Sequence, residues 1–182
     1  MIFNLPNGLT FLRMMLAPLI VLLLLEGAVV WALLVFLMAG VTDGLDGFLA
    51  RSWRERTEFG RILDPLADKI LLGSSFFTLA IVERLPLWLP GVCVGRDLIL
   101  IVGSCILYTV SGRLGYPPSS VGKLATVLQI VTIVAAMAVP EEGARLGPLI
   151  WGTAVVTLLS GLAYIYRGTA ELISRLRNAS PA

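Results

Sequence analysis

Asp43-Gly-Leu-Asp46-Gly-Phe-Leu-Ala-Arg51 and Gly60-Arg-Ile-Leu-Asp64-Pro-Leu-Ala-Asp68 together contain four of the five aspartates of the chain. The first segment closes a long apolar run and the second opens the next run, so both lie on the same side of the apolar layer that the runs would form. Within each segment the aspartates are three or four residues apart, which puts both carboxylates on one face of a helix. Two such pairs on adjacent antiparallel helices would place four carboxylates around one point.

The composition around these segments predicts a membrane protein. Of the 182 residues, 57% are hydrophobic and 14% are charged, whereas soluble domains have roughly 45–50% apolar and 25% charged residues. A helix that spans a bilayer needs about 20 apolar residues, and the chain contains six runs of about that length. We therefore expect an all-α polytopic membrane protein with six transmembrane helices and a single domain over residues 1–182. The runs are 8–25, 28–50, 59–82, 88–110, 121–139 and 146–166.

Positively charged residues predict which side of the membrane each connection faces, because they concentrate in cytoplasmic loops. With the N-terminus inside, the inner connections hold eight arginines and the outer ones hold Arg84 and Arg145. We expect a multi-pass protein of the cytoplasmic membrane, with both termini and the aspartates on the cytoplasmic side. The inner arginines are Arg51, Arg54, Arg56, Arg61, Arg113, Arg167, Arg175 and Arg177.

The residue types that the chain lacks exclude several classes of protein. There is no histidine, which excludes a Ser-His-Asp hydrolase, a histidine-based zinc site and a haem with a histidine ligand. The net charge is +2 and no basic stretch is long, so we expect no nucleic-acid partner.

The aspartates themselves predict a metal site. Ionised side chains in membrane helices are costly and mark functional sites, and four neighbouring carboxylates cannot all stay ionised unless a cation compensates them. Hard divalent cations such as Mg²⁺ or Mn²⁺ prefer oxygen ligands. Two such cations, about 3.5–4 Å apart, can clamp the attacking and leaving oxygens of a phosphoryl displacement. The spacing therefore indicates phosphoryl transfer at a membrane surface.

Two glycines beside the aspartates are open to two interpretations. Gly47 follows Asp46 and Gly60 lies one turn before Asp64. Glycine costs a helix about 1 kcal/mol relative to alanine, and here it would leave space for a phosphate-bearing ligand, which Arg51 could balance. Alternatively, these glycines only let membrane helices pack closely.

Taken together, the spacing is Asp-x2-Asp-Gly-x2-Ala-Arg-x8-Gly-x3-Asp-x3-Asp over residues 43–68. It matches every position of the signature of the CDP-alcohol phosphatidyltransferase family. Residues 4–13, Asn-Leu-Pro-Asn-Gly-Leu-Thr-Phe-Leu-Arg, resemble the start of the family's phosphatidylglycerophosphate synthases and cardiolipin synthases. Residues 63–69 are similar to both, and the resemblance extends over about residues 4–166.

The resemblance implies a membrane enzyme of phospholipid biosynthesis with the family's fold of six transmembrane helices, a homodimer and two divalent cations, commonly Mg²⁺. Such an enzyme transfers the phosphatidyl group of CDP-diacylglycerol to an alcohol and releases CMP. Asp68 would also be the general base that takes the proton of the acceptor hydroxyl. The metal ligands would be Asp43, Asp46, Asp64 and Asp68. The CDP end of the donor would contact Gly47, Ala50, Arg51 and Gly60.

The acceptor stays open between glycerol 3-phosphate, which gives phosphatidylglycerophosphate, and phosphatidylglycerol, which gives cardiolipin. Arg96-Asp97 and the single Lys123 look more like the family's cardiolipin synthases, whereas Gly122-Lys123 looks more like its glycerophosphate enzymes. Arg96 and Lys123 are our candidates for binding the acceptor phosphate. The alternatives are a structural ion pair between Arg96 and Asp97, and a Lys123 that extends to lipid headgroups.

Other functions predict other features. The same chemistry could serve another small alcohol, such as inositol phosphate or serine. A cation transporter with buried carboxylates would show an internal repeat and helices interrupted at the midplane, and we see neither in the sequence. A non-enzymatic structural membrane protein would not retain four buried aspartates at such a cost.

Overall fold

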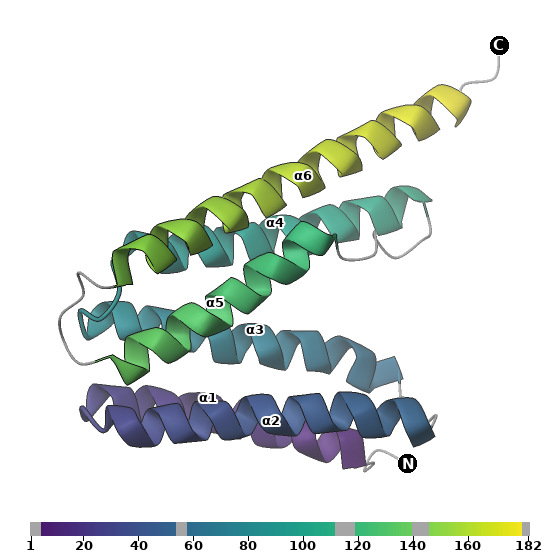
Figure 1. Cartoon of the computed structure of the whole chain (residues 1–182). Coiled ribbons are helices and arrows are strands. Elements are labelled where there is room, and N and C mark those ends of the chain that lie inside the picture. The colour runs from purple at the N-terminus through teal and green to yellow at the C-terminus, as the bar shows by residue number, and fades with distance from the viewer. Residues whose placement is uncertain (1–4, 54–57, 112–118, 140–145, 180–182) are drawn as a thin grey trace. The chain divides into compact units, whose positions relative to one another are not determined.

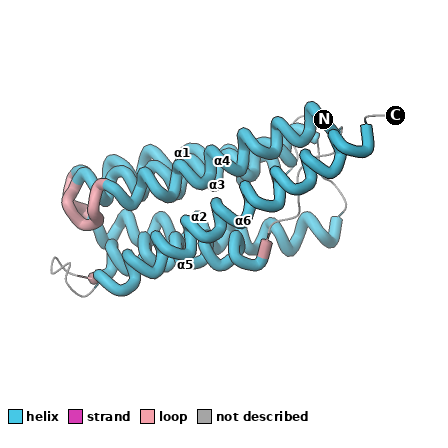
Figure 2. Tube along the Cα trace, turned by 90° about the horizontal axis from the view of Figure 1, so that it is seen from above, coloured by secondary structure: helices cyan, strands magenta, loops and turns pink. Residues whose placement is uncertain are grey.

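The computed structural model contains six α-helices within the residues it describes, as the six apolar runs predict. The backbone is described for residues 5–53, 58–111, 119–139 and 146–179, and side chains for 11–42, 66–106, 109, 119–139 and 146–170. Helix occupies nearly all of this described trace (Figure 2). In chain order the helices are α1 (Leu5–Leu25), α2 (Val29–Trp53), α3 (Glu58–Ile81), α4 (Trp88–Ser111), α5 (Ser120–Ala138) and α6 (Gly147–Ala179).

The end of α1 shows how local sequence stops these helices. The amide of Ala28 donates to the carbonyl of Leu23 at 2.8 Å, and the amide of Gly27 donates to that of Leu24 at 3.1 Å. This is the double hydrogen bond of a Schellman motif, which needs a left-handed residue just past the helix. Gly27 supplies it with a φ of 74°. The break that separates the apolar runs 8–25 and 28–50 is therefore confirmed at Glu26-Gly27.

The last helix is longer than the apolar run that predicted it. The run ends at residue 166, but α6 continues to Ala179. Its apolar, membrane-compatible part reaches Ala170. The residues beyond are mostly good helix formers such as leucine, arginine and alanine. The basic tail therefore continues the helix beyond its apolar part.

The chain divides into two compact units. One unit consists of Met1–Leu87 with Ile133–Arg145, and the other of Trp88–Thr132 with Leu146–Ala182. The single domain over residues 1–182 therefore stays a prediction.

In the first unit, α1 packs against both α2 and α3 (Figure 1). One face of α1 is almost completely buried along Arg13, Ala17, Ile20 and Leu24, which follow one another at the three- and four-residue steps of a helix face. The buried face is therefore apolar except for Arg13.

In the second unit, α4 packs along α6 (Figure 1). Trp88 and Trp151, at the starts of these two helices, lie with their ring centroids 5.1 Å apart. Hydroxyl and amide groups join α5 to α6: Thr132 and Thr153 share a hydrogen bond of 2.7 Å, and the Gln129 amide donates to Thr157 at 3.4 Å. Such interhelical hydrogen bonds are common between membrane helices, where apolar burial adds little.

Three helices are long and apolar enough to cross a membrane, judged over the described residues. Their apolar segments are Trp88–Ile106, Ser120–Ala138 and Gly147–Ala170, and α1 and α2 contribute the shorter apolar segments Phe11–Leu25 and Val29–Thr42. Large apolar side chains are widely exposed on these helices. Extensive apolar exposure is unusual for a soluble monomer, and the structure supports a membrane protein built from helices.

Candidate active site

The signature aspartates lie on consecutive helices of the first unit. Asp43 and Asp46 are on the second half of α2, and Asp64 and Asp68 are in the first turns of α3. Both pairs are helical in the structure, so the three- and four-residue spacings do put each pair on one helix face. Of the four carboxylates, only that of Asp68 belongs to a described side chain, and their convergence stays a prediction. The burial and contacts of the remaining signature residues are also outside what the structure describes; these residues are Gly47, Ala50, Arg51 and Gly60.

Asp68 is the signature aspartate whose side-chain environment the structure describes. Its carboxylate oxygen Oδ1 accepts a hydrogen bond from Nη1 of Arg13 on α1, and the two side chains form a salt bridge. The Asp68 side chain is 44% exposed, whereas that of Arg13 is 5% exposed. A carboxylate can accept several hydrogen bonds through its two oxygens. Asp68 therefore has one oxygen bound to Arg13 while its side chain remains accessible to other groups.

Arg13 is a residue that our sequence reasoning did not place in the site. It lies in the stretch that resembles the family, but no role followed from that resemblance. The signal was available: Arg13 is the only charged residue of α1, and an isolated charge in an apolar helix requires a partner. Which partner it finds depends on how α1 packs on α3, which the spacing does not reveal.

Arg96 forms the centre of a buried polar cluster in the second unit. From α4 it donates through Nη1 to Oδ1 of Asp97 at 2.8 Å, and through Nη2 to the hydroxyl of Ser160 on α6 at 3.0 Å. Longer contacts run from Nε to the Ser160 hydroxyl at 3.3 Å and from Nη2 to the carbonyl of Gly122 at 3.4 Å. Every guanidinium nitrogen thus has a protein partner, and the ion pair with Asp97 is present.

Lys123, the second candidate for binding the acceptor, lies near this cluster along the backbone. It follows Gly122, whose carbonyl Arg96 contacts, but its own side chain is exposed. The structure therefore brings Arg96 to the first turn of α5 without burying the lysine there. The role of both residues in acceptor binding stays a prediction.

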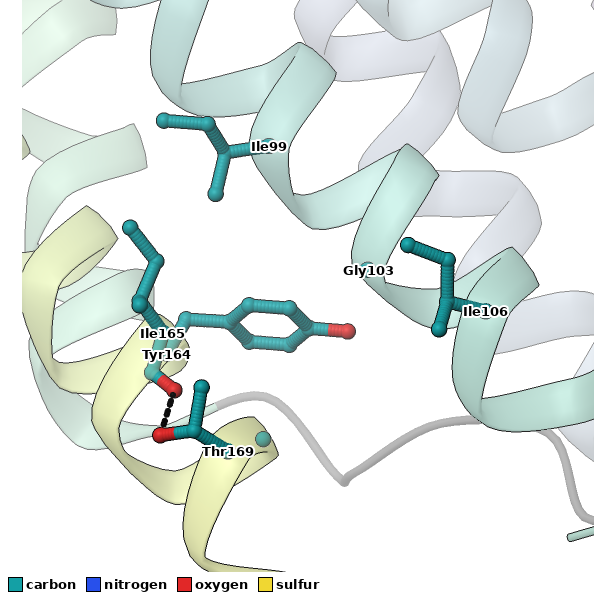
Figure 3. Close-up of a pocket in the computed structure, with 7 residues that line it drawn as sticks. Ile99, Gly103, Ile106, Tyr164, Ile165 and Thr169 are labelled. Carbon is teal, nitrogen blue, oxygen red and sulfur yellow. Dashed lines mark hydrogen bonds between the residues drawn. The ribbon is translucent and has the colours of Figure 1, made fainter. Parts of the chain in front are cut away.

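A small apolar pocket of about 190 Å³ lies between α4 and α6 (Figure 3). Gly103 forms part of its wall, and the ring of Tyr164 lies directly against this glycine. The Tyr164 hydroxyl shares a hydrogen bond of 2.7 Å with Ser104. The pocket could hold a hydrocarbon group but is not suited to catalysis, because its lining is almost entirely carbon. The residues that line it are Ile99, Gly103, Ile106, Tyr164, Ile165, Gly168 and Thr169.

The described side chains contain no group of three or more acidic, cysteine or histidine residues that could hold a metal ion. Only Asp68 of the four predicted ligands is among those side chains. The donor set itself fits a hard divalent cation, because carboxylate oxygens are the ligands that Mg²⁺ and Mn²⁺ prefer.

One known protein family matches most of the chain. The family model described as CDP-alcohol phosphatidyltransferase matches residues 3–161. The chain belongs to the CDP-alcohol phosphatidyltransferase family. The match includes α1 with Arg13, both aspartate pairs and the Arg96 cluster up to Ser160, and enzymes of the family generally use divalent metals.

Named relatives within the CDP-alcohol phosphatidyltransferases divide between two activities. The chain is 32% identical to human cardiolipin synthase (CMP-forming) over 91% of its length and 62% of the human protein. It is 40% identical to the cardiolipin synthase (CMP-forming) of Streptomyces coelicolor over 69% of its length and 60% of that protein. It is 31% identical to the CDP-diacylglycerol–glycerol-3-phosphate 3-phosphatidyltransferase of Sodalis glossinidius, over 93% of its length and 97% of that enzyme. The chain thus spans less than two thirds of both cardiolipin synthases.

Proposed function

We propose that the protein transfers the phosphatidyl group of CDP-diacylglycerol to a glycerol-type acceptor and releases CMP. The observation that carries this proposal is the family match over residues 3–161, within which all eight signature positions are present between residues 43 and 68. The acceptor is glycerol 3-phosphate or phosphatidylglycerol, in keeping with relatives named for phosphatidyl transfer to glycerol 3-phosphate and for cardiolipin synthesis.

In this reaction the acceptor hydroxyl oxygen attacks the phosphorus that carries the diacylglycerol group. A new phosphorus–oxygen bond forms, and the bond to the CMP oxygen breaks with its electron pair going to CMP. The hydroxyl proton passes to the carboxylate of Asp68 and then to water. Asp68 suits this role because its side chain is accessible while one oxygen is held by Arg13, and a general base must be both reachable and positioned.

The cofactor we propose is a pair of Mg²⁺ ions, with Mn²⁺ as a substitute, held by Asp43, Asp46, Asp64 and Asp68. Support comes from the hard oxygen donors and from their placement on two consecutive helices. When bound, divalent cations would neutralise phosphate charge and favour loss of the hydroxyl proton. We further propose that Gly47, Ala50, Arg51 and Gly60 line the site of the CDP moiety.

For the acceptor phosphate we propose Lys123 and Arg96, in different capacities. Lys123 is exposed on the first turn of α5 and could reach an anionic group directly. Arg96 already binds Asp97 and Ser160. It also contacts the carbonyl of Gly122 in the first turn of α5, so we propose that it helps to position the turn that carries Lys123. Either acceptor carries a phosphate, which a cation can bind through charge-assisted hydrogen bonds.

We propose six membrane spans in the cytoplasmic membrane, with the active site on the cytoplasmic side and a homodimer as the assembly. Support comes from the six helices, three of them long and apolar enough to span a membrane, and from the arginine distribution. Cysteine labelling of intact cells tests the orientation in a background without native cysteines. A cysteine at position 52 should resist an impermeant thiol reagent and one at position 143 should react. The reverse pattern would contradict the orientation.

The reaction is tested with purified protein in detergent micelles that contain CDP-diacylglycerol and Mg²⁺. Glycerol 3-phosphate, phosphatidylglycerol, inositol phosphate and serine are added in separate reactions, and CMP release and the mass of the lipid product are measured. We expect phosphatidylglycerophosphate or cardiolipin, with one CMP for each product lipid. Product formation only with inositol phosphate or serine, or no CMP release with any acceptor, would contradict the proposal.

A further inference from the structure

Arg13 is placed where a charged residue is costly. It belongs to the buried face of α1 that continues through Ala17, Ile20 and Leu24, and only 4% of the residue is exposed. Moving an unpaired charge into such surroundings costs much more than a hydrogen bond returns, so a buried cation is found with a partner. A leucine at this position would satisfy packing alone.

The partner of this cation is a residue of the catalytic signature. Arg13 lies 55 residues from Asp68 in the chain, and the contact joins α1 to α3. On α3, Asp68 directly follows Ala67, which is completely buried. Leu71, three residues after Asp68, is 5% exposed. The backbone of Asp68 is thus held by packing, while its side chain remains 44% exposed.

We propose that Arg13 is a positioning residue that fixes the Asp68 carboxylate for its part in phosphatidyl transfer. The proposal rests on the function proposed above. The guanidinium is a rigid planar fork whose N–H directions match a carboxylate, and it holds Oδ1 from the buried side. The Asp68 side chain stays 44% exposed beside this contact, so the pair restricts the carboxylate while leaving it accessible.

A purely structural role for Arg13 predicts different behaviour. In that case removing the guanidinium loosens the packing of α1 on α3 and lowers activity whatever residue stands at position 68. If Arg13 acts through the carboxylate, its removal matters only while the carboxylate is present. Residues that act as one unit show this non-additivity in activity, and contacting residues show it in stability.

The experiment is a double-mutant cycle with Arg13→Gln and Asp68→Asn, assayed for CMP release at saturating Mg²⁺ and CDP-diacylglycerol. We expect Arg13→Gln to lower kcat by about tenfold or more, since small displacements of a catalytic group can cost up to about 10²-fold. The KM for CDP-diacylglycerol should change less than about twofold. In the Asp68→Asn background, Arg13→Gln should lower kcat by less than about twofold. An equal loss in both backgrounds would overturn the proposal.

The matched control is Arg84→Gln, in the same unit. Arg84 donates to the carbonyls of Ala136 and Val139 at 3.1 and 3.3 Å, so it joins helix ends through backbone groups. Its loss should lower the unfolding temperature and leave kcat within about twofold of the wild type. If Arg84→Gln reduced kcat as much as Arg13→Gln, the effect of Arg13 would be structural and the proposal would fail.

A second readout needs neither metal nor substrate. Thermal unfolding in chelator should show that Arg13→Gln lowers the unfolding temperature less in the Asp68→Asn background than in the wild type, because the pair is already broken there. Should Arg13→Gln not fold, Arg13→Lys takes its place, since it keeps the charge but not the fork. Equal unfolding shifts in both backgrounds would overturn the pairing.

The two proposals fail in different ways. A wild type that releases no CMP from CDP-diacylglycerol with any acceptor would overturn the proposed function, and with it the catalytic role of Arg13. A wild type that is active and loses activity on Asp68→Asn, but responds to Arg13→Gln equally in both backgrounds, would overturn the role of Arg13 alone.

Discussion

Replacing Arg96 with methionine tests whether the polar cluster of the second unit holds that unit together. Methionine keeps much of the side-chain length and removes the charge, the 2.8 Å contact with Asp97 and the 3.0 Å contact with Ser160. The other two contacts, at 3.3 and 3.4 Å, are long and contribute less. The main loss is therefore one ion pair and one good hydrogen bond.

The expected magnitude follows from the burial of the pair. Removing one partner of a buried ion pair costs about 3–5 kcal/mol, and we take the lower end because the Asp97 side chain retains 19% exposure. A change of about 3 kcal/mol in a chain of this length lowers the unfolding temperature by about 6–12 °C. Adding Asp97→Asn should recover part of the loss, because the carboxylate that lost its contact with Arg96 is then replaced by a neutral amide.

The assay is thermal unfolding of purified protein in one detergent, with Lys123→Met as the control. Lys123 is exposed one residue from Gly122, so its replacement removes a nearby cation without touching the cluster and should shift the unfolding temperature by less than about 2 °C. A loss below about 2 °C for Arg96→Met, or an equal loss for both variants, would show that the Arg96 cluster does not hold the second unit together.

Three further predictions concern the pocket, the acceptor and the metal. Gly103→Ala would put its Cβ 2.7 Å from Cε1 of Tyr164, so the ring must move and the hydrogen bond to Ser104 weakens. The unfolding temperature should fall more than in Tyr164→Phe, and an unchanged value would contradict the close contact. Lys123→Met should raise the KM for the acceptor several-fold and leave that for CDP-diacylglycerol unchanged, and equal KM changes would argue against acceptor binding. Excess chelator should abolish CMP release and added Mg²⁺ or Mn²⁺ should restore it, whereas full activity in chelator would exclude the metal mechanism.

The helices could be predicted from the sequence because hydropathy and helix-stopping residues are local. The end of α1 is one example, since Glu26-Gly27 interrupts the apolar run and Gly27 adopts the left-handed conformation there. For α6 the apolar run predicted the membrane-compatible segment but not the full length of the helix. Hydropathy falls after residue 166, but helix propensity does not, so the apolar segment ends near Ala170 while the helix continues to Ala179.

For the site, the sequence predicted which residues share a face of one helix, but not which residues of different helices are in contact. Asp64 and Asp68 are one turn apart on α3, which their four-residue separation already required. The contact of Asp68 with Arg13 and that of Arg96 with Ser160 each join helices far apart in the chain. Such partners depend on how helices pack, which the spacing of residues along the sequence does not reveal.

The turnover of Asp68→Asn, compared with its binding of CDP-diacylglycerol, tests directly whether the Asp68 carboxylate takes part in the reaction. Asparagine keeps the shape and one oxygen of the side chain but cannot accept the proton of the acceptor hydroxyl. We expect kcat to fall by about 10²-fold or more, the usual scale for a general base, and the CDP-diacylglycerol affinity to stay within about threefold of the wild type. The exposed Glu26→Gln, the same carboxylate-to-amide change in the turn after α1, should keep full activity. Near-normal turnover of Asp68→Asn would contradict the central claim that this carboxylate takes part in the reaction.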